Sequence, residues 1–233
     1  MAAVRSASGR RPLRYRRRNP VPALLLILLL SSLASMVWLI VLDSTESQRL
    51  RSCPPPSPGD RGSPSVEVLE RTALDEVPPA PPQLTRVQVL NGNGQRGEAA
   101  LVSAGLADLG FQPAGVPAND PLHPTFELIC HGQIRFGDAG AAAARTLSLV
   151  VPCAELVRDV RPSDVVDLAL GTGFTKLEPS AEARAVLASL VRLGQAAPPS
   201  EAPQGGQAAG LVQPTIDPQQ IVAAREVDCG SVR

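Results

Sequence analysis

The residues with the clearest potential for chemistry form a glycine-rich turn, GNGQRG, at positions 92–97. The turn matches the pattern G-x-G-x-x-G, follows a predicted strand over 86–90 and precedes a predicted helix that begins at Glu98. In that context, bare backbone and the free amides of a helix N-terminus can hold a pyrophosphate group. A dinucleotide site also needs an acidic residue at the end of the next strand, whereas Asp120 lies in the loop beyond that strand. We therefore expect neither a nucleotide nor any other cofactor.

Two other interpretations of this turn are open. Glycines allow a tight change of direction between strand and helix, with the side chain of Asn91 or Asn93 bonding the free amides. Alternatively, an anion or a glycan contacts the same amides with the help of Arg96. The structural interpretation is favoured, and the other defines a candidate ligand-binding set. That set is Asn91, Gly92, Asn93, Gly94, Arg96 and Gly97.

The four cysteines, Cys53, Cys130, Cys153 and Cys229, predict two disulfides if this part of the chain is exported. Three connectivities are available. Cys130 closes one predicted strand and Cys153 leads into the next across a helix, so we favour this pair. The remaining bond, between Cys53 and Cys229, would tie the C-terminal tail back to the segment that follows the membrane span.

The two histidines give little support for a metal site or for catalysis. Together with Cys130 and Cys153 they offer candidate metal ligands, but no C-x-x-C or H-x-x-x-H spacing accompanies them. His123 lies in the segment PLHPT, and His131 lies in a predicted tight turn. The chain also has no G-x-S-x-G elbow that would present a nucleophilic serine. We expect no metal ion and no enzymatic activity.

The elements that position these residues form one small domain over residues 84–178. Alternating apolar residues and helical spacing predict an α/β fold, with α+β as the alternative, in which two helices pack on a mixed sheet. The expected strands are 86–90, 111–116, 126–130, 134–136, 154–159 and 165–170, and the expected helices are 98–109 and 137–150.

An apolar stretch over residues 21–42 precedes the domain. Its 22 residues carry no charge, and a helix of that length covers the roughly 30 Å hydrocarbon core of a bilayer. A cleaved signal peptide is the alternative, because small residues occur at 32–35. The apolar run continues well past them, however, and a signal peptide usually has only about 7–15 apolar residues. We expect a membrane-spanning anchor.

Charges at the two ends of this span predict its orientation. Seven arginines precede it, whereas Asp43 and Glu46 follow it, so the N-terminus is expected in the cytoplasm and the domain outside. The chain has 22 basic residues, and these seven lie before the span. The part that follows the span therefore has 15 basic residues and all 22 acidic residues. An acidic exported part argues against nucleic acid as a partner.

The rest of the chain is expected to form tails and connections. Residues 43–83 contain many prolines and predict a stalk, within which residues 66–75 can pack on the domain as a short helix. The remaining expected segments are a cytoplasmic arginine-rich tail (1–20), a helix (179–194), a disordered linker (195–216), and a short helix with a cysteine-containing tail (217–233).

Three runs of sequence resemble the LytR C-terminal (LytR_C) domain family, an extracytoplasmic module of cell-envelope proteins. They are VQVLNGNGQRGEAALVSAGLADLGF (87–111), IRFGDAGAAAARTLSLV (134–150) and VVDLALGTGF (165–174). The resemblance implies a non-catalytic role in envelope integrity and an influence on virulence. In larger relatives the module follows a LytR-CpsA-Psr catalytic domain, for which the segment 43–83 offers no room. The family has no agreed ligand residues to carry over.

Two hypotheses about function follow. In the first, the protein is a membrane-anchored interaction module that contacts a cell-wall glycopolymer or an envelope-assembly protein. In the second, it is an accessory that presents a phosphorylated lipid or glycan to a separate cell-wall glycopolymer ligase, using the turn at 91–97.

Overall fold

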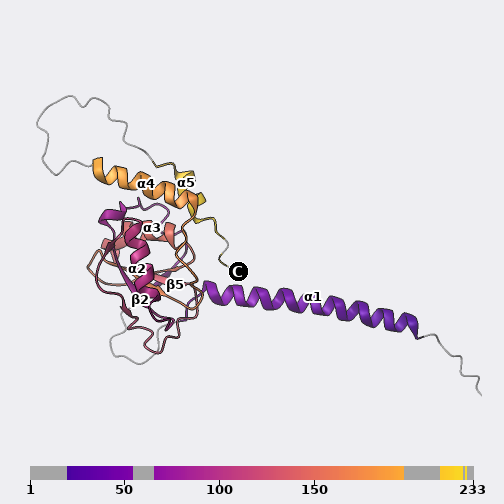
Figure 1. The fold of residues 1–233 in the computed structure, drawn as a ribbon. Coiled ribbons are helices and arrows are strands. Elements are labelled where there is room, and N and C mark those ends of the chain that lie inside the picture. The colour runs from indigo at the N-terminus through magenta and orange to yellow at the C-terminus, as the bar shows by residue number, and fades with distance from the viewer. Residues whose placement is uncertain (1–19, 55–65, 197–215, 228, 230–233) are drawn as a thin grey trace, which may run out of the picture. The chain divides into compact units, whose positions relative to one another are not determined.

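A computed structural model describes residues 20–54, 66–196, 216–227 and 229 of the chain (Figure 1). By its internal contacts the chain divides into two compact units, residues 1–43 and 44–233. The predicted arginine-rich tail and all but the ends of the predicted linker lie outside the described residues.

The predicted apolar helix is confirmed as α1 (Val21–Arg51). Its segment Val21–Val41 is long and apolar enough to cross a membrane. The helix runs beyond residue 42 into the predicted stalk. The reason is local, since residues 43–53 contain no proline or glycine and the first helix-breaking residue is Pro54.

The second unit is built on a mixed sheet of seven strands, as expected for an α/β domain. The strand order is β1-β6-β5-β7-β2-β3, and β4 also pairs with β2. Parallel pairs join β2 to β3, β4 and β7 and join β5 to β6, whereas β5–β7 and β1–β6 are antiparallel. The strands are β1 (Glu67–Leu69), β2 (Arg86–Asn91), β3 (Gln112–Pro113), β4 (Ala118–Asn119), β5 (Gly132–Phe136), β6 (Glu155–Arg158) and β7 (Val166–Leu170).

Two helices connect neighbouring parallel strands and cover one face of the sheet. Helix α2 (Glu98–Asp108) follows β2, and α3 (Ala141–Val150) follows β5 after a short 3-10 turn, η2 (Asp138–Gly140). Right-handed crossovers in opposite directions place both helices on the same face. Their apolar side chains join those of the sheet in one core, to which Val102, Leu147 and Leu168 belong.

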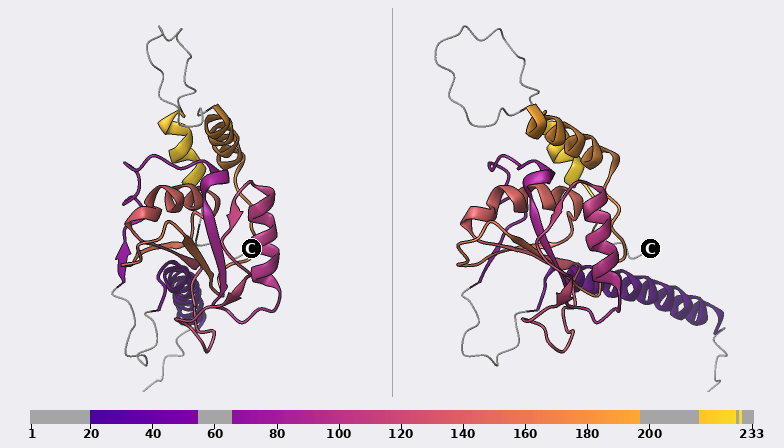
Figure 2. Two further views of the ribbon diagram at one scale, coloured as in Figure 1. Left: turned by 90° about the vertical axis from the view of Figure 1, so that its left-hand side faces the viewer. Right: turned by 60° about the vertical axis from the view of Figure 1, so that its left-hand side comes forward.

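Two more helices extend this core. Helices α4 (Ala181–Ala196) and α5 (Pro218–Arg225) lie side by side next to α3 (Figures 1 and 2). Val186 of α4 and Ala224 of α5 are buried in the same core as α2 and α3. The helices predicted at 179–194 and after 217 are therefore present, but as part of the domain rather than beyond it.

The sheet and the core include residues that precede position 84, the predicted start of the domain. Strand β1 pairs with β6 where a short helix was expected, and Leu74 is buried in the core. A further 3-10 turn, η1 (Pro82–Leu84), leads into β2. The sequence VEV at 66–68 alternates apolar and acidic residues, which suits an edge strand better than a helix.

The strand predicted over 126–130 is wrong. The segment is irregular, and Phe126 has a φ of 61°. Leu128 is buried and exchanges backbone hydrogen bonds with loops, its amide donating to Gly92 O and its carbonyl accepting from Thr172. Alternate burial of Leu128 and Cys130 produces a strand-like pattern without a partner strand.

The favoured cysteine pairing is also wrong. The disulfides join Cys53 to Cys130 and Cys153 to Cys229, with Cα–Cα distances of 5.0 and 5.4 Å. Cys130 packs with Leu90 and Ala169 in a small cluster separate from the main core. Cys153 instead follows α3, on the core side of the sheet. Cys130 and Cys153 are therefore not brought together, although a single helix separates them in the chain.

Candidate functional site

The glycine-rich turn is closed by its own asparagines. Asn91 Oδ1 accepts from the Gly94 amide at 2.8 Å, and Asn93 Oδ1 accepts from the Gln95 amide at 2.9 Å. Asn93 Nδ2 also donates to Gly171 O at 3.0 Å and to Glu98 Oε2 at 2.6 Å. The asparagine side chains thus occupy amides that a phosphate would use, and a carboxylate lies beside them.

Backbone conformation and close packing explain why glycine occupies these positions of the turn. Gly94 and Gly97 have φ of 80° and 81°, in the left-handed region that glycine enters without strain. A Cβ on Gly92 would lie 2.9 Å from Leu170 O in the neighbouring strand β7. These contacts support the structural interpretation of the motif. Arg96 takes part in none of them and lies exposed at the end of the turn.

Arg96 borders a groove between α2 and the segment Phe174–Pro179, which follows β7. The groove has a volume of about 590 Å³. Its apolar lining includes Val102 and Leu177, while Leu101 is 76% exposed. An exposed leucine beside buried apolar side chains gives the groove an apolar wall that is open to solvent.

Charged side chains of both signs surround the groove. Lys176 is paired with Glu178, so the local charge is mixed rather than strongly basic. Such a groove suits a ligand with apolar and polar parts better than a simple anion. The charged residues that line it are Arg96, Glu98, Asp108, Lys176 and Arg184.

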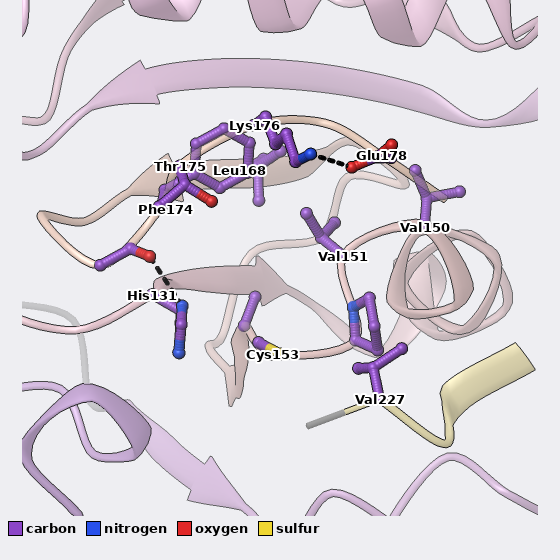
Figure 3. A pocket seen from close by; sticks show the side chains of 13 residues that line it. His131, Val150, Val151, Cys153, Leu168, Phe174, Thr175, Lys176, Glu178 and Val227 are labelled. Carbon is purple, nitrogen blue, oxygen red and sulfur yellow. Dashed lines mark hydrogen bonds and ion pairs between the residues drawn. The ribbon is translucent and has the colours of Figure 1, made fainter. Parts of the chain in front are cut away.

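A smaller hollow of about 220 Å³ lies on the other side of the same segment (Figure 3). Phe174, Thr175 and Lys176 line both cavities, so this segment forms a wall between them. The rest of the smaller hollow is mostly apolar and includes Val151 and Val227. The groove and this hollow, which the sequence pattern did not predict, together make the candidate site.

His131 holds one border of the smaller hollow in place. Its Nδ1 lies 2.8 Å from Gly173 O and its Nε2 lies 2.7 Å from Cys229 O. Both partners are carbonyl oxygens, which accept hydrogen bonds and cannot donate them. The imidazole therefore links β5, the segment after β7 and the C-terminal tail, and its nitrogens are engaged in structural contacts.

A buried polar cluster lies on the face of the sheet away from α2 and α3. Arg135 of β5 donates from Nη1 and Nη2 to the two oxygens of Asp120, each at 2.7 Å. His123 Nδ1 lies 2.9 Å from the same carboxylate. All three side chains are buried. They fasten the loop between β4 and β5 over the sheet.

The electrostatics of this cluster depend on Asp120. Burial alone would raise the pKa of Asp120, but hydrogen bonds from His123 and from the Arg135 guanidinium outweigh burial and hold that pKa well below its usual range. An arginine between apolar residues in the strand sequence QIRF was the signal that could have revealed this cluster. It indicates that a carboxylate must lie nearby, but not which one.

The cysteine and histidine residues considered as metal ligands are not available together. Cys130 and Cys153 are each in a disulfide, and His123 and His131 serve separate structural contacts. Within the described ranges, no group of three or more His, Cys, Asp or Glu side chains could hold a metal ion.

Comparison with known proteins places the chain among cell-envelope proteins. Residues 84–174 match the LytR_C family, described as LytR cell envelope-related transcriptional attenuator. The Cell envelope integrity protein Cei of Mycobacterium tuberculosis is 43% identical over 180 residues, which are 76% of this chain and 82% of that protein.

A solved structure gives the same result. It is the crystal structure of the soluble domain of a conserved hypothetical secreted protein from Mycobacterium marinum, which is 42% identical. The match has a TM-score of 0.56 and covers 68% of this chain and 95% of that chain. The family match spans the glycine-rich turn, α2 and α3, and the identity to Cei extends over three quarters of the chain. The chain therefore belongs to the LytR_C domain family and is a relative of the cell envelope integrity protein Cei.

Proposed function

We propose that this protein is a membrane-anchored, non-catalytic extracytoplasmic module that maintains cell-envelope integrity by contacting a cell-wall polymer or an envelope-assembly protein. The observation that carries the proposal is the 43% identity to Cei over most of the chain. The groove beside α2 is the contact surface in this proposal.

Two features support an anchored and exported domain. Segment Val21–Val41 has the length and hydropathy of a membrane span, and arginines precede it whereas acidic residues follow it. All four cysteines are in disulfides, which form and persist in oxidising compartments outside the cytoplasm.

The use of the two histidines supports a role without catalysis. His123 is buried against Asp120, and His131 is held between two carbonyl oxygens. A general base forms a hydrogen bond to the serine or cysteine that it activates. In the part of the chain that the structure describes, neither histidine forms such a hydrogen bond.

The groove supports a binding role through its size and lining. Its volume of about 590 Å³ is within the range of roughly 300–1,000 Å³ that ligand pockets usually have. Leu101 presents an apolar side chain from α2, and Arg96 and Arg184 supply hydrogen-bond donors at the border. A sugar ring or a peptide side chain offers both kinds of surface.

Photo-crosslinking in living cells tests this surface. A photoreactive amino acid at Leu101 is expected to capture an envelope component as a discrete adduct. The matched control is Val116, which is 85% exposed and lines neither the groove nor the smaller hollow. Equal capture at both positions, or capture at Val116 alone, would contradict the proposal.

The alternative function, presentation of a phosphorylated lipid or glycan to a glycopolymer ligase, has one observation in its favour. Arg96 is exposed at the N-terminus of α2, and a Cβ on Gly97 would meet nothing within 4 Å, so there is space for a ligand there. Arg96→Gln tests this alternative, with the exposed Arg192→Gln as control. A loss of affinity for lipid-linked phosphate in Arg96→Gln alone would favour it.

A further inference from the structure

A cluster of arginines lies away from the groove, where the turn after β1, helix α3 and helix α5 meet. Arg71, Arg145 and Arg225 come from these three elements and line one cavity, where Arg145 and Arg225 contact Asp75. The sequence pattern assigned two of these elements to a stalk and a tail, so it could not bring the three arginines together.

One carboxylate oxygen serves two of the guanidinium groups. Asp75 Oδ1 lies 2.8 Å from Arg145 Nη1 and also accepts from Arg225 Nη1. The Arg145 side chain is only 3% exposed, and that of Arg225 is 12% exposed. The second terminal nitrogen of Arg225 donates to Arg71 O. A single carboxylate therefore faces two buried cations.

The hydrogen-bonding capacity of these two arginines is not filled. Within the described residues, Nε and Nη1 of Arg145 and Nε of Arg225 are buried without a hydrogen-bond partner. Arg145 Nη1 is close to Asp75, but the contact is not an aligned hydrogen bond. Burial and the neighbouring charge of Arg145 both lower the pKa of Arg225. Positive charge is thus in excess at this point of the fold.

A cavity of about 360 Å³ opens beside the cluster. All three arginines line it, together with Thr72 and Asp75, and Glu226 lies at its exposed border. Arg71 reaches across to Pro152 O at 2.8 Å, which fixes its guanidinium next to the disulfide that joins Cys153 to Cys229. The guanidinium groups of Arg145 and Arg225 are therefore held within the fold, and the exposed Arg71 is tethered to it by these contacts.

We infer that this cavity, lined by Arg71, Arg145 and Arg225, binds a phosphate group. Three guanidinium groups against the carboxylates of Asp75 and Glu226 leave the lining with net positive charge. A phosphate monoester carries about −1.5 to −2 at neutral pH, and its oxygens match the planar fork of an arginine. The site is distinct from the groove beside α2, so this inference does not rest on the proposed function.

Binding of inorganic phosphate to the full chain in a phosphate-free maltoside detergent tests the inference. At constant ionic strength, phosphate is expected to bind saturably in calorimetry and to raise the thermal unfolding temperature as its concentration increases, whereas chloride does neither. Glycerol 3-phosphate, a soluble phosphate monoester, should also bind saturably.

Variants identify the residues. Arg71→Gln leaves both Asp75 ion pairs in place and should weaken phosphate binding about tenfold, and Arg71→Gln with Arg225→Gln should abolish it. Arg192→Gln, on the exposed side of α4, removes one arginine elsewhere and should bind like the unaltered protein. Each variant is measured well below its own unfolding temperature, so a loss of stability is not mistaken for a loss of binding.

Added lipid distinguishes the source of the phosphate. Binding of phosphatidic acid, but not phosphatidylcholine, that disappears in Arg71→Gln supports a lipid headgroup in this same site. Binding of the soluble monoester alone supports a soluble or polymer-borne phosphate. The inference is overturned if the unaltered protein shows no saturable response to phosphate or to either monoester, or if the double variant responds equally.

Discussion

At the scale of single residues, the buried contact between Arg135 and Asp120 carries the strongest consequence for stability. Removal of one member of a buried ion pair leaves an uncompensated charge, which typically costs about 3–5 kcal/mol. Arg135→Met should therefore lower the free energy of unfolding by that amount in chemical denaturation. The control is Arg158→Met in β6, whose ion pairs with Glu67 and Asp138 are exposed and worth about 1 kcal/mol or less. Similar losses in the two variants would show that the buried pair has no special role.

The same aspartate predicts how stability responds to acid. Because the pKa of Asp120 is lower in the folded protein than in the unfolded chain, its contribution is complete above the usual aspartate pKa of about 4. That contribution is lost as pH falls below this value toward the folded-state pKa. Unfolding measured between about pH 2 and pH 7 should show this decline, and Asp120→Asn should have a less steep decline. An equally steep decline in the variant would assign the acid sensitivity to other carboxylates.

At the scale of elements, the local sequence pattern predicted the strands and helices whose formation depends on residues close together in the chain. Strands β2 and β7 and helix α2 lie within a residue or two of their predicted ranges, because alternation and helical spacing are local properties. The segment 126–130 was mistaken for a strand because its buried side chains alternate. Which face of the sheet a residue occupies depends on the whole topology, and that is why the cysteine pairing was wrong.

The disulfides give an element-scale prediction. Peptide mapping of the unreduced protein by mass spectrometry should find Cys53 linked to Cys130 and Cys153 linked to Cys229. Each bond joins residues more than 70 positions apart, so its loss should cost about 4 kcal/mol by the chain-entropy account. Cys53→Ser with Cys130→Ser should retain the other bond. Detection of a peptide in which Cys130 is linked to Cys153 would contradict the placement of these two cysteines on different faces of the sheet.

At the scale of the whole molecule, segments expected to be a stalk and a tail contribute to the domain. Leu74 and Ala224 are buried in its core, and Arg71 and Arg225 line the cavity next to α3. The family match over residues 84–174 includes neither end. Contacts between segments about 150 residues apart leave no periodic signal in the sequence, so neither the packing of these end segments on the domain nor the arginine cluster could be predicted from it.

The proposed role at the cell envelope requires the domain to lie outside the cytoplasm. The most direct measurement is the activity of a reporter fused after residue 233 in the living bacterium. Alkaline phosphatase, which needs its own disulfides and is active only after export, should be active in this fusion, whereas a reporter that works only in the cytoplasm should be silent. Cytoplasmic activity with inactive phosphatase would contradict the membrane orientation and, with it, a direct role at the cell envelope.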